Sequence, residues 1–522
     1  AEYMGTYFKY YTLPVMANSK YEYVKSFETG DEIPFPNVIV LVIDGRDFRR
    51  FSKIHLFEKP SDVRALHLMN SCAVAVAEEF PDIVFSYGFS DEYSFVFKKA
   101  TKFYQRRSSK ILSLVVSFFT SCYVSQWKKF FAQLELQFPP SFHGRVSSCA
   151  TMECLQEHLT WRQYECHISN QYDTCLWMMI KSGMSKEEAE ECLQGTRKQD
   201  KHDLLFQKFE LNYNDLPQIF RQGSCILKKE SEEVVKYNDN GVPIIRMRKK
   251  NVILHSESIS SYKFWNGHSV LIKELGLFSE ISLKIKRNIL KEFTLENQLM
   301  PSTWIVIRID GSHFHRFSDI HKFEKPNDMR ALNLMNSCAK VILKEFKDLV
   351  FAYGVSDEYS FVLQKKSQLY HRLASKIVST IVSYFSATFV LKWDMFFPNT
   401  KLLYPPHFDG RAVCYPSSEI LKDYLRWRQV DCHVNNQYNT CFWTLVKSGK
   451  TKTQSQNILK GSQSQDKYEL LRSQFGIEYN DLPPIFRQGS SVFKEKESGD
   501  VIVEHCNIMK ETFWDTQSGI ID

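Results

Sequence analysis

A chain of 522 residues in which 43% are hydrophobic is too long for one ordinary core and apolar enough to fill two or more, which predicts a multidomain globular protein. A formal charge of +7 suits a polyanionic partner but is too mild on a chain of this length to establish one. The sequence has no run of eighteen apolar residues and no secretory signal, which predicts a soluble, intracellular protein without a membrane span.

The first elements along the chain alternate between strands and helices. Residues 37–45 (NVIVLVIDG) are an apolar, β-branched run stopped by glycine, typical of a buried strand that ends at a turn. Residues 59–80 have apolar side chains at helical spacing after a Pro-Ser-Asp start, which predicts a helix. Residues 82–99 predict two strands joined by a tight turn, and residues 108–127 a second helix. These elements are most of a ferredoxin-like βαββαβ plan, an α+β fold.

The same series of motifs then appears a second time. The stretch DGRDFRRFSKIHLFEKPSD from Asp44 returns from Asp310 as DGSHFHRFSDIHKFEKPND, 266 residues later. SDEYSFV, WRQYECHISNQYDTC and NDLPQIFRQGS return at the same offset, the last two with few changes. A fixed offset over this length predicts two tandem copies of one domain, because solenoid repeats are far shorter.

The repeat also sets the predicted domain boundaries. Residues 1–15 lack an initiator methionine and precede a plausible one at Met16, so we treat them as a non-native leader. The pair Phe264-Trp265 matches Phe513-Trp514 only 249 residues later, so the second copy has a shortened tail. We therefore expect a first module over residues 16–278 and a second over residues 279–522.

The thirteen cysteines bear on redox state and metal binding. They are odd in number and never form a Cys-x-x-Cys pair, so they favour neither a disulfide framework nor a zinc site. We expect reduced, mostly buried thiols.

Carboxylates close the predicted strands in both copies. Asp44 ends the first strand and Asp91-Glu92 lies at the hairpin turn, with Asp310 and Asp357-Glu358 as counterparts. In a ferredoxin-like sheet these strands are neighbours, so the carboxylates can converge and hold Mg²⁺, which prefers hard oxygen ligands. The alternative is that both motifs are ordinary turns. Their recurrence in both copies beside basic residues favours a metal site; these residues are Lys59, Lys110, Lys325 and Lys376.

Two further features suit phosphate or nucleic acid. The Asp-Gly turns (DGRDFR and DGSHFH) can offer consecutive backbone amides to a triphosphate, although this signal is weak alone. Polar clusters around His167 and His433 stand in front of an aromatic-rich helix and suit base or phosphate recognition, or are half-buried polar groups without that role. The basic run RMRKK at 246–250 is typical of a phosphate contact or of a solvated face.

Taken in order, the motifs resemble those of a known family. Strand-DG, KP(N/S)D, SDEYSFVF, FDGR, WRQ-x-DCH-x-NNxYN and GTxxxDK resemble the tRNA-histidine guanylyltransferases, over both modules nearly end to end. Six such motifs in order at matching spacing are highly specific. Plant members that carry two modules in one chain are the most similar.

The resemblance implies a polymerase-palm fold and a reaction. The expected enzyme adds guanosine to the 5′ end of tRNA-His, opposite in direction to ordinary polymerases. It activates the tRNA 5′-phosphate with ATP, the 3′-hydroxyl of GTP attacks, and pyrophosphate is removed, with two Mg²⁺ per active site.

The resemblance also implies roles for individual residues. Catalysis and metal binding fall to Asp310, Gly311 and Asp357, and equivalently to Asp44, Gly45 and Asp91. tRNA recognition falls to Arg428, Asp431 and His433. The expected nucleotide-binding residues are Asp310, Gly311, Ser312, His313, Phe314, His315, Lys325, Ser356, Asp357, Lys376 and Asn439 in the second module, and Asp44, Gly45, Arg46, Asp47, Phe48, Arg49, Lys59, Ser90 and Asp91 in the first.

The first module departs from the family pattern. Val42 stands where the second module has Arg308, and Asp173 where it has Asn439. A carboxylate at position 173 should repel a triphosphate at a cost on the order of 1–3 kcal/mol if the site is partly desolvated. The second module is therefore the better candidate for full activity. The first is a weak binder or a tRNA platform, although its metal carboxylates survive.

Other functions stay open at this stage. A non-catalytic RNA-binding platform is weakened by the retained Asp310, Asp357 and Lys325, and a nucleotide cyclase by the WRQ and HVNN segments, for which a cyclase has no obvious need. Repair of the 5′ ends of other RNAs is not separable by sequence from the histidine-specific reaction. We expect two chains to pair into a four-module particle, located in the nucleus, the cytoplasm or both.

Overall fold

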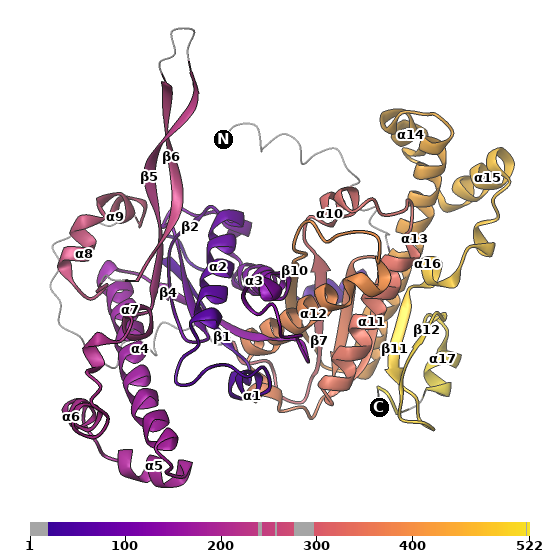
Figure 1. The fold of residues 1–522 in the computed structure, drawn as a ribbon. Helices are drawn as coiled ribbons and strands as arrows, with labels where there is room; N and C mark the ends of the chain where they lie inside the picture. The colour runs from indigo at the N-terminus through magenta and orange to yellow at the C-terminus, as the bar shows by residue number, and fades with distance from the viewer. Residues whose placement is uncertain (1–18, 238–242, 256–257, 276–296, 518, 522) are drawn as a thin grey trace. The chain divides into compact units, whose positions relative to one another are not determined.

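The computed structural model describes residues 19–237, 243–255, 258–275, 297–517 and 519–521. In these residues each repeat folds around its own six-stranded antiparallel sheet (Figure 1). The strand orders are β4-β1-β3-β2-β5-β6 and β10-β7-β9-β8-β11-β12. The predicted leader 1–15 and the predicted boundary between residues 278 and 279 lie outside the described residues.

The first repeat has the following elements. Its strands are β1 (Val38–Gly45), β2 (Ile83–Phe89), β3 (Glu92–Phe97), β4 (Phe142–Cys149), β5 (Ser224–Tyr237) and β6 (Pro243–Leu254). Its helices are α1 (Phe48–Ile54), α2 (Val63–Glu79), α3 (Ser108–Phe130), α4 (Met152–Lys181), α5 (Lys186–Leu193), α6 (Lys198–Phe209), α7 (Gln218–Gln222), α8 (Tyr262–Gly267) and α9 (Ser269–Leu275). Short 3-10 helices are η2 (Glu22–Phe27), η3 (Phe103–Arg106) and η4 (Tyr213–Asp215).

The second repeat has the corresponding elements. Its strands are β7 (Trp304–Gly311), β8 (Leu349–Val355), β9 (Glu358–Leu363), β10 (Phe408–Tyr415), β11 (Ser490–Lys494) and β12 (Val501–Glu504). Its helices are α10 (Phe314–Ile320), α11 (Met329–Glu345), α12 (Ala374–Phe396), α13 (Ser418–Lys447), α14 (Lys452–Leu459), α15 (Ser464–Phe475), α16 (Pro484–Gln488) and α17 (Glu511–Thr516). Its 3-10 helices are η6 (Leu369–Arg372) and η7 (Tyr479–Asp481).

The predicted α+β, ferredoxin-like plan is confirmed in both repeats. Strands β1 to β4 alternate with α2 and α3 as βαββαβ, and β1 lies between β4 and β3. The start of α2 follows from its sequence, because the Asp62 carboxylate accepts a hydrogen bond from the Arg64 amide at 2.9 Å. The predicted hairpin turn is Ser90-Asp91, between the end of β2 and the start of β3.

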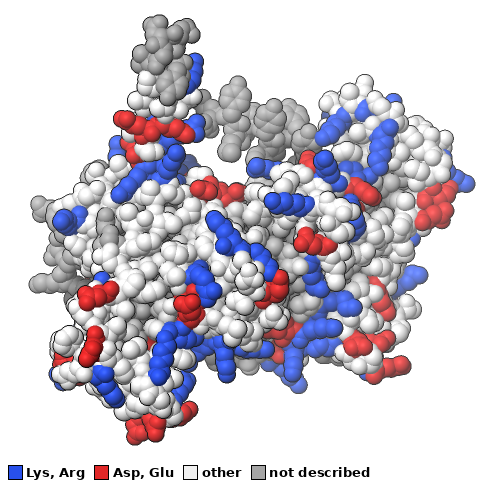
Figure 2. Space-filling view, viewed as in Figure 1, with Lys and Arg blue, Asp and Glu red and all other residues white. Residues whose placement is uncertain are grey.

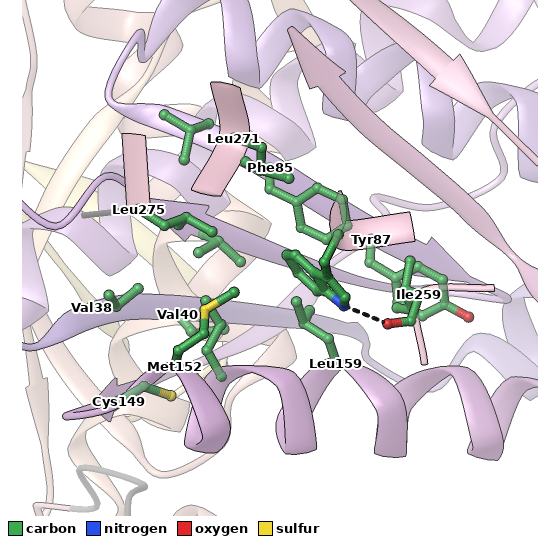
Figure 3. Close-up of a cluster of buried hydrophobic side chains, with 14 of the residues drawn as sticks. Val38, Val40, Phe85, Tyr87, Cys149, Met152, Leu159, Ile259, Leu271 and Leu275 are labelled. Atoms are coloured by element: carbon green, nitrogen blue, oxygen red, sulfur yellow. Dashed lines mark hydrogen bonds between the residues drawn. The ribbon is translucent and has the colours of Figure 1, made fainter. Parts of the chain in front are cut away.

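The core of the first repeat lies between one face of its sheet and the helices α4, α8 and α9 (Figure 3). Val38 and Val40 are two apart on β1 and so point to the same face, where they pack with Met152 of α4. The Trp265 indole donates to the Ile259 carbonyl at 2.9 Å, and Trp514 donates to Ile508 at 2.9 Å in the second repeat. The predicted match of Phe264-Trp265 with Phe513-Trp514 is therefore confirmed.

One local prediction was wrong. The polar clusters around His167 and His433 do not precede a helix but lie in the middle of α4 and α13, each 30 residues long. The reason is the position of the caps: Thr151 and Ser417 accept hydrogen bonds from the first-turn amides and start each helix well before the cluster. The Arg, Gln and His side chains therefore project from helices rather than from a loop.

The described residues group into two compact units that differ slightly from the repeats. The described residues of 1–30 belong with those of 298–374 and 388–522, and residues 375–387 belong with the described residues of 31–297. In the first of these units, Val24 of η2 is buried in the core of the second repeat. In the other, the Ser379 hydroxyl of α12 accepts the Gly144 amide of edge strand β4 at 2.8 Å. Each unit is thus completed by a short segment of the other repeat.

Two helices are unusually apolar. By length and composition α3 and α12 are both apolar enough to cross a membrane, but 78% and 72% of these stretches are buried inside the protein. Core helices of this kind are expected in a mixed sheet-and-helix domain. All thirteen cysteines are free and most are buried, as predicted.

The cap of α11 gives a test of this fold. Asp328 is 5% exposed, and its carboxylate accepts the amides of Glu324 at 3.0 Å and Arg330 at 2.9 Å. We predict that Asp328→Ala lowers the free energy of unfolding by about 1–2 kcal/mol, because the two amides lose their acceptor. Urea unfolding measures this. The exposed Asp394→Ala on α12 is the control, and an equal loss for both would contradict the capping role.

Candidate active site

The pairing of the central strands brings the predicted carboxylates together. Asp44 on β1 lies opposite Glu92 on β3, and Asp310 on β7 lies opposite Glu358 on β9. At the same point the Gly45 amide donates to the Asp91 carbonyl at 3.1 Å, and the Gly311 amide to the Asp357 carbonyl at 3.0 Å. Residues 47 apart in sequence therefore meet at one end of the sheet, as expected from the strand order.

The two glycines allow a close approach. A Cβ at Gly45 would lie 2.8 Å from Asp91 Oδ2 and 2.3 Å from the Phe48 ring, and one at Gly311 would lie 2.4 Å from the Phe314 ring. A side chain would therefore fill the space into which the Asp91 carboxylate projects. The site brings two carboxylates together, and carboxylate oxygens are hard ligands.

The loop after each glycine is only partly available for phosphate. Asp47 and His313 adopt the left-handed conformation, each with φ of 54°. Such strain in non-glycine residues is found at functional sites. However, the Arg46 amide donates to the Ser141 carbonyl and the Ser312 amide to the His407 carbonyl, both at 2.9 Å. The amides of Gly45 and Gly311 also donate within the protein. The first two amides of each expected phosphate-binding run therefore already have acceptors.

The carboxylates repel one another. Burial and the Asp44 charge raise the pKa of Asp91 to about 6, against a hydrogen bond from Ser90 that lowers it. Burial also raises the pKa of Asp44. In the second repeat burial and the neighbouring Asp357 raise the pKa of Asp310, and burial raises that of Asp357. A cation between the carboxylates would relieve this repulsion.

A cavity opens beside the hairpin turn of each repeat. Its volume is about 340 Å³ in the first repeat and about 190 Å³ in the second. The predicted residues that line these cavities are Phe48, Arg49, Lys59, Ser90 and Asp91, and Phe314, His315, Lys325, Ser356, Asp357 and Asn439. Those in the adjoining strand ends and loops rather than in the lining are Asp44, Gly45, Arg46 and Asp47, and Asp310, Gly311, Ser312 and His313.

The cavity lysines are held by contacts that were not predicted. Lys325 donates to the Ser318 hydroxyl at 2.7 Å and lies 5.8 Å from the centre of the Trp443 ring. Lys59 makes the same contacts with Ser52, at 2.9 Å, and with Trp177, at 6.0 Å. Both tryptophans recur at the repeat offset, so the sequence held a signal for them. Each lysine is thus directed along the wall of its cavity.

Lys376 lies in the unit of the first repeat. It begins the segment 375–387 of α12, where Thr380, one turn further on, contacts the His143 ring at 2.6 Å. His143 is in turn the partner of Asp44 across β1 and β4. The positive charge of Lys376 accordingly acts against the rise in the pKa of Asp44. The structure therefore brings this lysine near the carboxylates of the first repeat.

A buried ion cluster lies behind the second carboxylate pair. Arg428 is 7% exposed and donates to Glu358 Oε1 through Nε at 2.7 Å, while Arg308 Nη2 lies 2.7 Å from Glu358 Oε2. Arg428 also donates to Asp431 at 2.8 Å. The guanidinium predicted to contact tRNA is thus engaged within the protein. The first repeat keeps the Arg162–Glu92 pair but has Val42 in place of the second arginine.

His433 is half-buried on α13, outside the cavity lining. Tyr479 donates to its carbonyl at 3.3 Å and to Asn436 Oδ1 at 3.0 Å. Burial and the Arg487 charge lower the pKa of the His433 ring and so favour its neutral form. Asn436 also donates to Asn327 at 3.1 Å in the cavity wall. His433 is therefore connected to the cavity through a hydrogen-bonded side chain.

Among the described residues no group of three or more His, Cys, Asp and Glu side chains is arranged to hold a metal ion. The site instead offers two carboxylates, and Mg²⁺ held by one or two carboxylates completes its shell with water and substrate oxygens. That arrangement fits a cation shared with a phosphate-bearing substrate.

A ferredoxin-like palm with paired carboxylates on its central strands, beside a lysine-lined cavity, defines the palm-type nucleotidyltransferases. The family profile described as tRNAHis guanylyltransferase matches residues 21–150 and 287–416, and that described as Thg1 C terminal domain matches residues 153–264 and 419–517. The chain belongs to the tRNA(His) guanylyltransferase family and carries its two parts twice in tandem.

Full-length relatives share this tandem organisation. The chain is 60% identical over 521 residues to tRNA(His) guanylyltransferase 1 of Arabidopsis thaliana, covering 98% of this chain and 92% of the relative. It is 57% identical to tRNA(His) guanylyltransferase 2 of the same plant, covering 97% and 99%. The Schizosaccharomyces pombe tRNA(His) guanylyltransferase is 53% identical over 206 residues, covering 39% of this chain and 78% of the relative.

Two solved structures match about half of the chain. The Saccharomyces cerevisiae tRNA(His) guanylyltransferase is 40% identical and covers 44% of this chain and 99% of its own, with a TM-score of 0.40. A bacterial tRNA(His) guanylyltransferase-like protein in complex with ATP is 24% identical and covers 43% of this chain and 93% of its own, with a TM-score of 0.37.

The ion cluster gives a second test. Burial would raise the pKa of Glu358, but the charges of Arg308 and Arg428 hold it below its ordinary value. We predict that Glu358→Gln destabilises the protein at neutral pH by up to about 3 kcal/mol, because Arg308 and Arg428 lose a shared partner, although Arg428 keeps Asp431. The matched Glu92→Gln removes one ion pair, that with Arg162, which keeps Glu165 as a partner, and so costs less.

The pH dependence has a definite sign. The pKa of Glu358 is lowered in the folded state, so its ionised carboxylate stabilises the fold at pH values above the ordinary carboxyl pKa. This stabilisation is lost as the pH falls through the folded-state pKa. Urea unfolding of the wild type and of Glu358→Gln should therefore converge at acidic pH. A difference that does not change with pH would contradict the ion cluster as its cause.

Proposed function

We propose that this chain adds a guanosine to the 5′ end of tRNA-His, with the second repeat as the main catalyst. The observation that carries the proposal is the meeting of Asp310 and Asp357 beside a cavity lined by Lys325 and Asn439. Membership of the tRNA(His) guanylyltransferase family supports it. In the proposed course ATP activates the tRNA 5′-phosphate, the 3′-hydroxyl of GTP attacks, and pyrophosphate is removed.

The oxygen donors fit Mg²⁺. Asp310, the Gly311 carbonyl and Asp357 would hold two ions, as would Asp44, Gly45 and Asp91 in the first repeat. Support comes from the raised pKa values of these buried carboxylates, which a cation would offset. When bound, Mg²⁺ activates the attacking oxygen and neutralises charge on the leaving phosphate.

The chain's own residues bind and orient the nucleotide. Lys325 supplies a positive charge on the cavity wall, and Ser356 and Asn439 line the same cavity as uncharged hydrogen-bonding groups. The loop from Ser312 to His315 borders the cavity and is proposed to contact the triphosphate. The buried pair of Arg428 and Glu358 holds the strand end that carries Asp357. Asp431 and His433 are proposed to face the tRNA.

The first repeat is proposed to bind nucleotide more weakly. Asp173 lines its cavity where Asn439 lines the second. The Asp173 carboxylate is exposed, so water screens its repulsion of a triphosphate and the effect is smaller than in a dry site.

The proposal extends to assembly and location. Two chains are proposed to pair into a four-module particle, and the enzyme to work on tRNA in the nucleus, the cytoplasm or both.

The catalytic assignment has a direct test. Purified chain is incubated with 5′-monophosphorylated tRNA-His, ATP, labelled GTP and Mg²⁺, and label at the RNA 5′ end is measured. Asp310→Ala should abolish incorporation, because the second repeat loses a metal ligand, whereas Asp44→Ala should retain most of it. Loss with Asp44→Ala alone would assign catalysis to the first repeat. If the wild type labels no RNA, a non-catalytic RNA platform replaces the proposal.

The weaker first cavity has a separate test. In a chain whose second site carries Asp310→Ala, Asp173→Asn should raise the affinity for labelled GTP roughly two- to tenfold, since one screened like charge is removed. The reverse change, Asn439→Asp with Asp44→Ala, should lower affinity at the second cavity by a similar factor. Equilibrium binding measures both. Unchanged affinity in the two cases would show that this position does not face the triphosphate.

A further inference from the structure

The first repeat carries a long two-stranded ribbon, and the second repeat has only a short equivalent. Strands β5 (Ser224–Tyr237) and β6 (Pro243–Leu254) have 14 and 12 residues, against 5 and 4 in β11 and β12. The pairing of β5 with the rest of the sheet ends at Leu227, and beyond it β5 pairs with β6 alone. The ribbon projects from its sheet (Figure 1). An isolated two-stranded ribbon contributes little to stability, which points to a role in binding.

The register sorts the charges of the ribbon onto one face. Lys229 lies opposite Lys250, Ser231 opposite Arg248, and Glu233 opposite Arg246. Residues directly opposite one another, and those two apart on a strand, share a face. We call this set of six residues the basic face, since it carries four cations and one carboxylate.

The other face differs in character. Its opposed pairs are Glu230 with Lys249, Glu232 with Met247, and Val234 with Ile245. These six residues carry two carboxylates and one cation, and the apolar side chains among them are well exposed, Met247 to 58%. Figure 2 shows basic and acidic side chains together along the projecting ribbon, and the register separates them between the two faces.

The cations of the basic face are available to a stronger anion. Arg248 Nε lies 2.8 Å from Glu233, and Lys250 Nζ lies 3.9 Å from the same carboxylate, but the side chains of Arg248 and Lys250 are 57% and 59% exposed. Exposed ion pairs contribute little, so phosphate can compete for these groups. Cations at every second position of a strand stand about 6–7 Å apart, a linear array suited to a polyanionic backbone.

We propose that the basic face of the β5–β6 ribbon binds the phosphate backbone of RNA, at a site whose residues line neither catalytic cavity. RNA is favoured over a protein partner because four cations and a single carboxylate stand along this face. RNA helices are recognised largely through backbone and shape, which needs an array of cations rather than base-reading groups. That this RNA is the tRNA substrate rests on the function proposed above.

The test measures affinity of the full chain for labelled 5′-monophosphorylated tRNA-His over a series of salt concentrations. The variant Arg246→Gln/Arg248→Gln/Lys250→Gln removes three charges from the basic face, and Lys249→Gln removes one from the opposite face. The triple variant should bind about tenfold or more weakly at low salt. Its slope of log affinity against log salt should fall by about 2–3, since each lost phosphate contact removes 0.7–0.9. Lys249→Gln should change neither.

The outcomes separate this inference from the proposed activity. An unchanged affinity for RNA and an unchanged salt slope in the triple variant would overturn the RNA contact. Binding of the wild type and the triple variant to anionic lipid vesicles is measured in parallel. If the triple variant loses vesicle binding but keeps RNA binding, the RNA contact is likewise overturned. Guanosine addition at saturating RNA should persist in the triple variant, and Asp310→Ala should bind RNA with the wild-type slope. If the wild type labels no RNA but the triple variant still has a smaller salt slope than the wild type, the proposed guanosine addition is refuted and the RNA contact is supported.

Discussion

The antiparallel pairing of the first and third strands is the constraint on which each site depends. It sets Asp44 opposite Glu92 and Asp310 opposite Glu358, and it directs the amide of the following glycine to the carbonyl of Asp91 or Asp357. A slip of one residue would turn one carboxylate to the opposite face of the sheet. The buried valines and isoleucines of β1 and β7, which fix the register, therefore also fix the spacing of the acidic pair.

Acidic residues packed this closely need positive charge around them. In the second repeat Arg308 and Arg428 both pair with Glu358, so the acidic end of the sheet is partly neutralised from inside the protein. In the first repeat Val42 removes one of these arginines, and the positive charges of Arg145, Arg162 and Lys376 oppose the rise in the pKa of Asp44 instead. The two repeats thus reach a similar balance with different residues, which explains how the first tolerates the loss.

The sequence predicted the parts of this arrangement that follow from local patterns. Strand periodicity, the Asp62 helix start and the repeat offset gave the ferredoxin-like plan and the meeting of Asp44 with Asp91. The middle position of His433 on α13 was missed because a serine cap far upstream begins the helix. The engagement of Arg428 by Glu358 depends on a contact between a helix and a strand 70 residues apart. The position of Lys376 near Asp44 depends on packing of α12 against β4, for which no short motif exists.

The retained carboxylates of the first repeat argue for a bound cation there. A scaffold has no physical need for Asp44 and Asp91, whose mutual repulsion and burial raise the pKa of Asp91 to about 6 and oppose folding near neutral pH. Either residue could be lost with a gain in stability if nothing bound between them. Other features of the same site have diverged, including Val42 and Asp173. The cation proposed for the first repeat would offset this repulsion, whether or not that repeat completes the reaction.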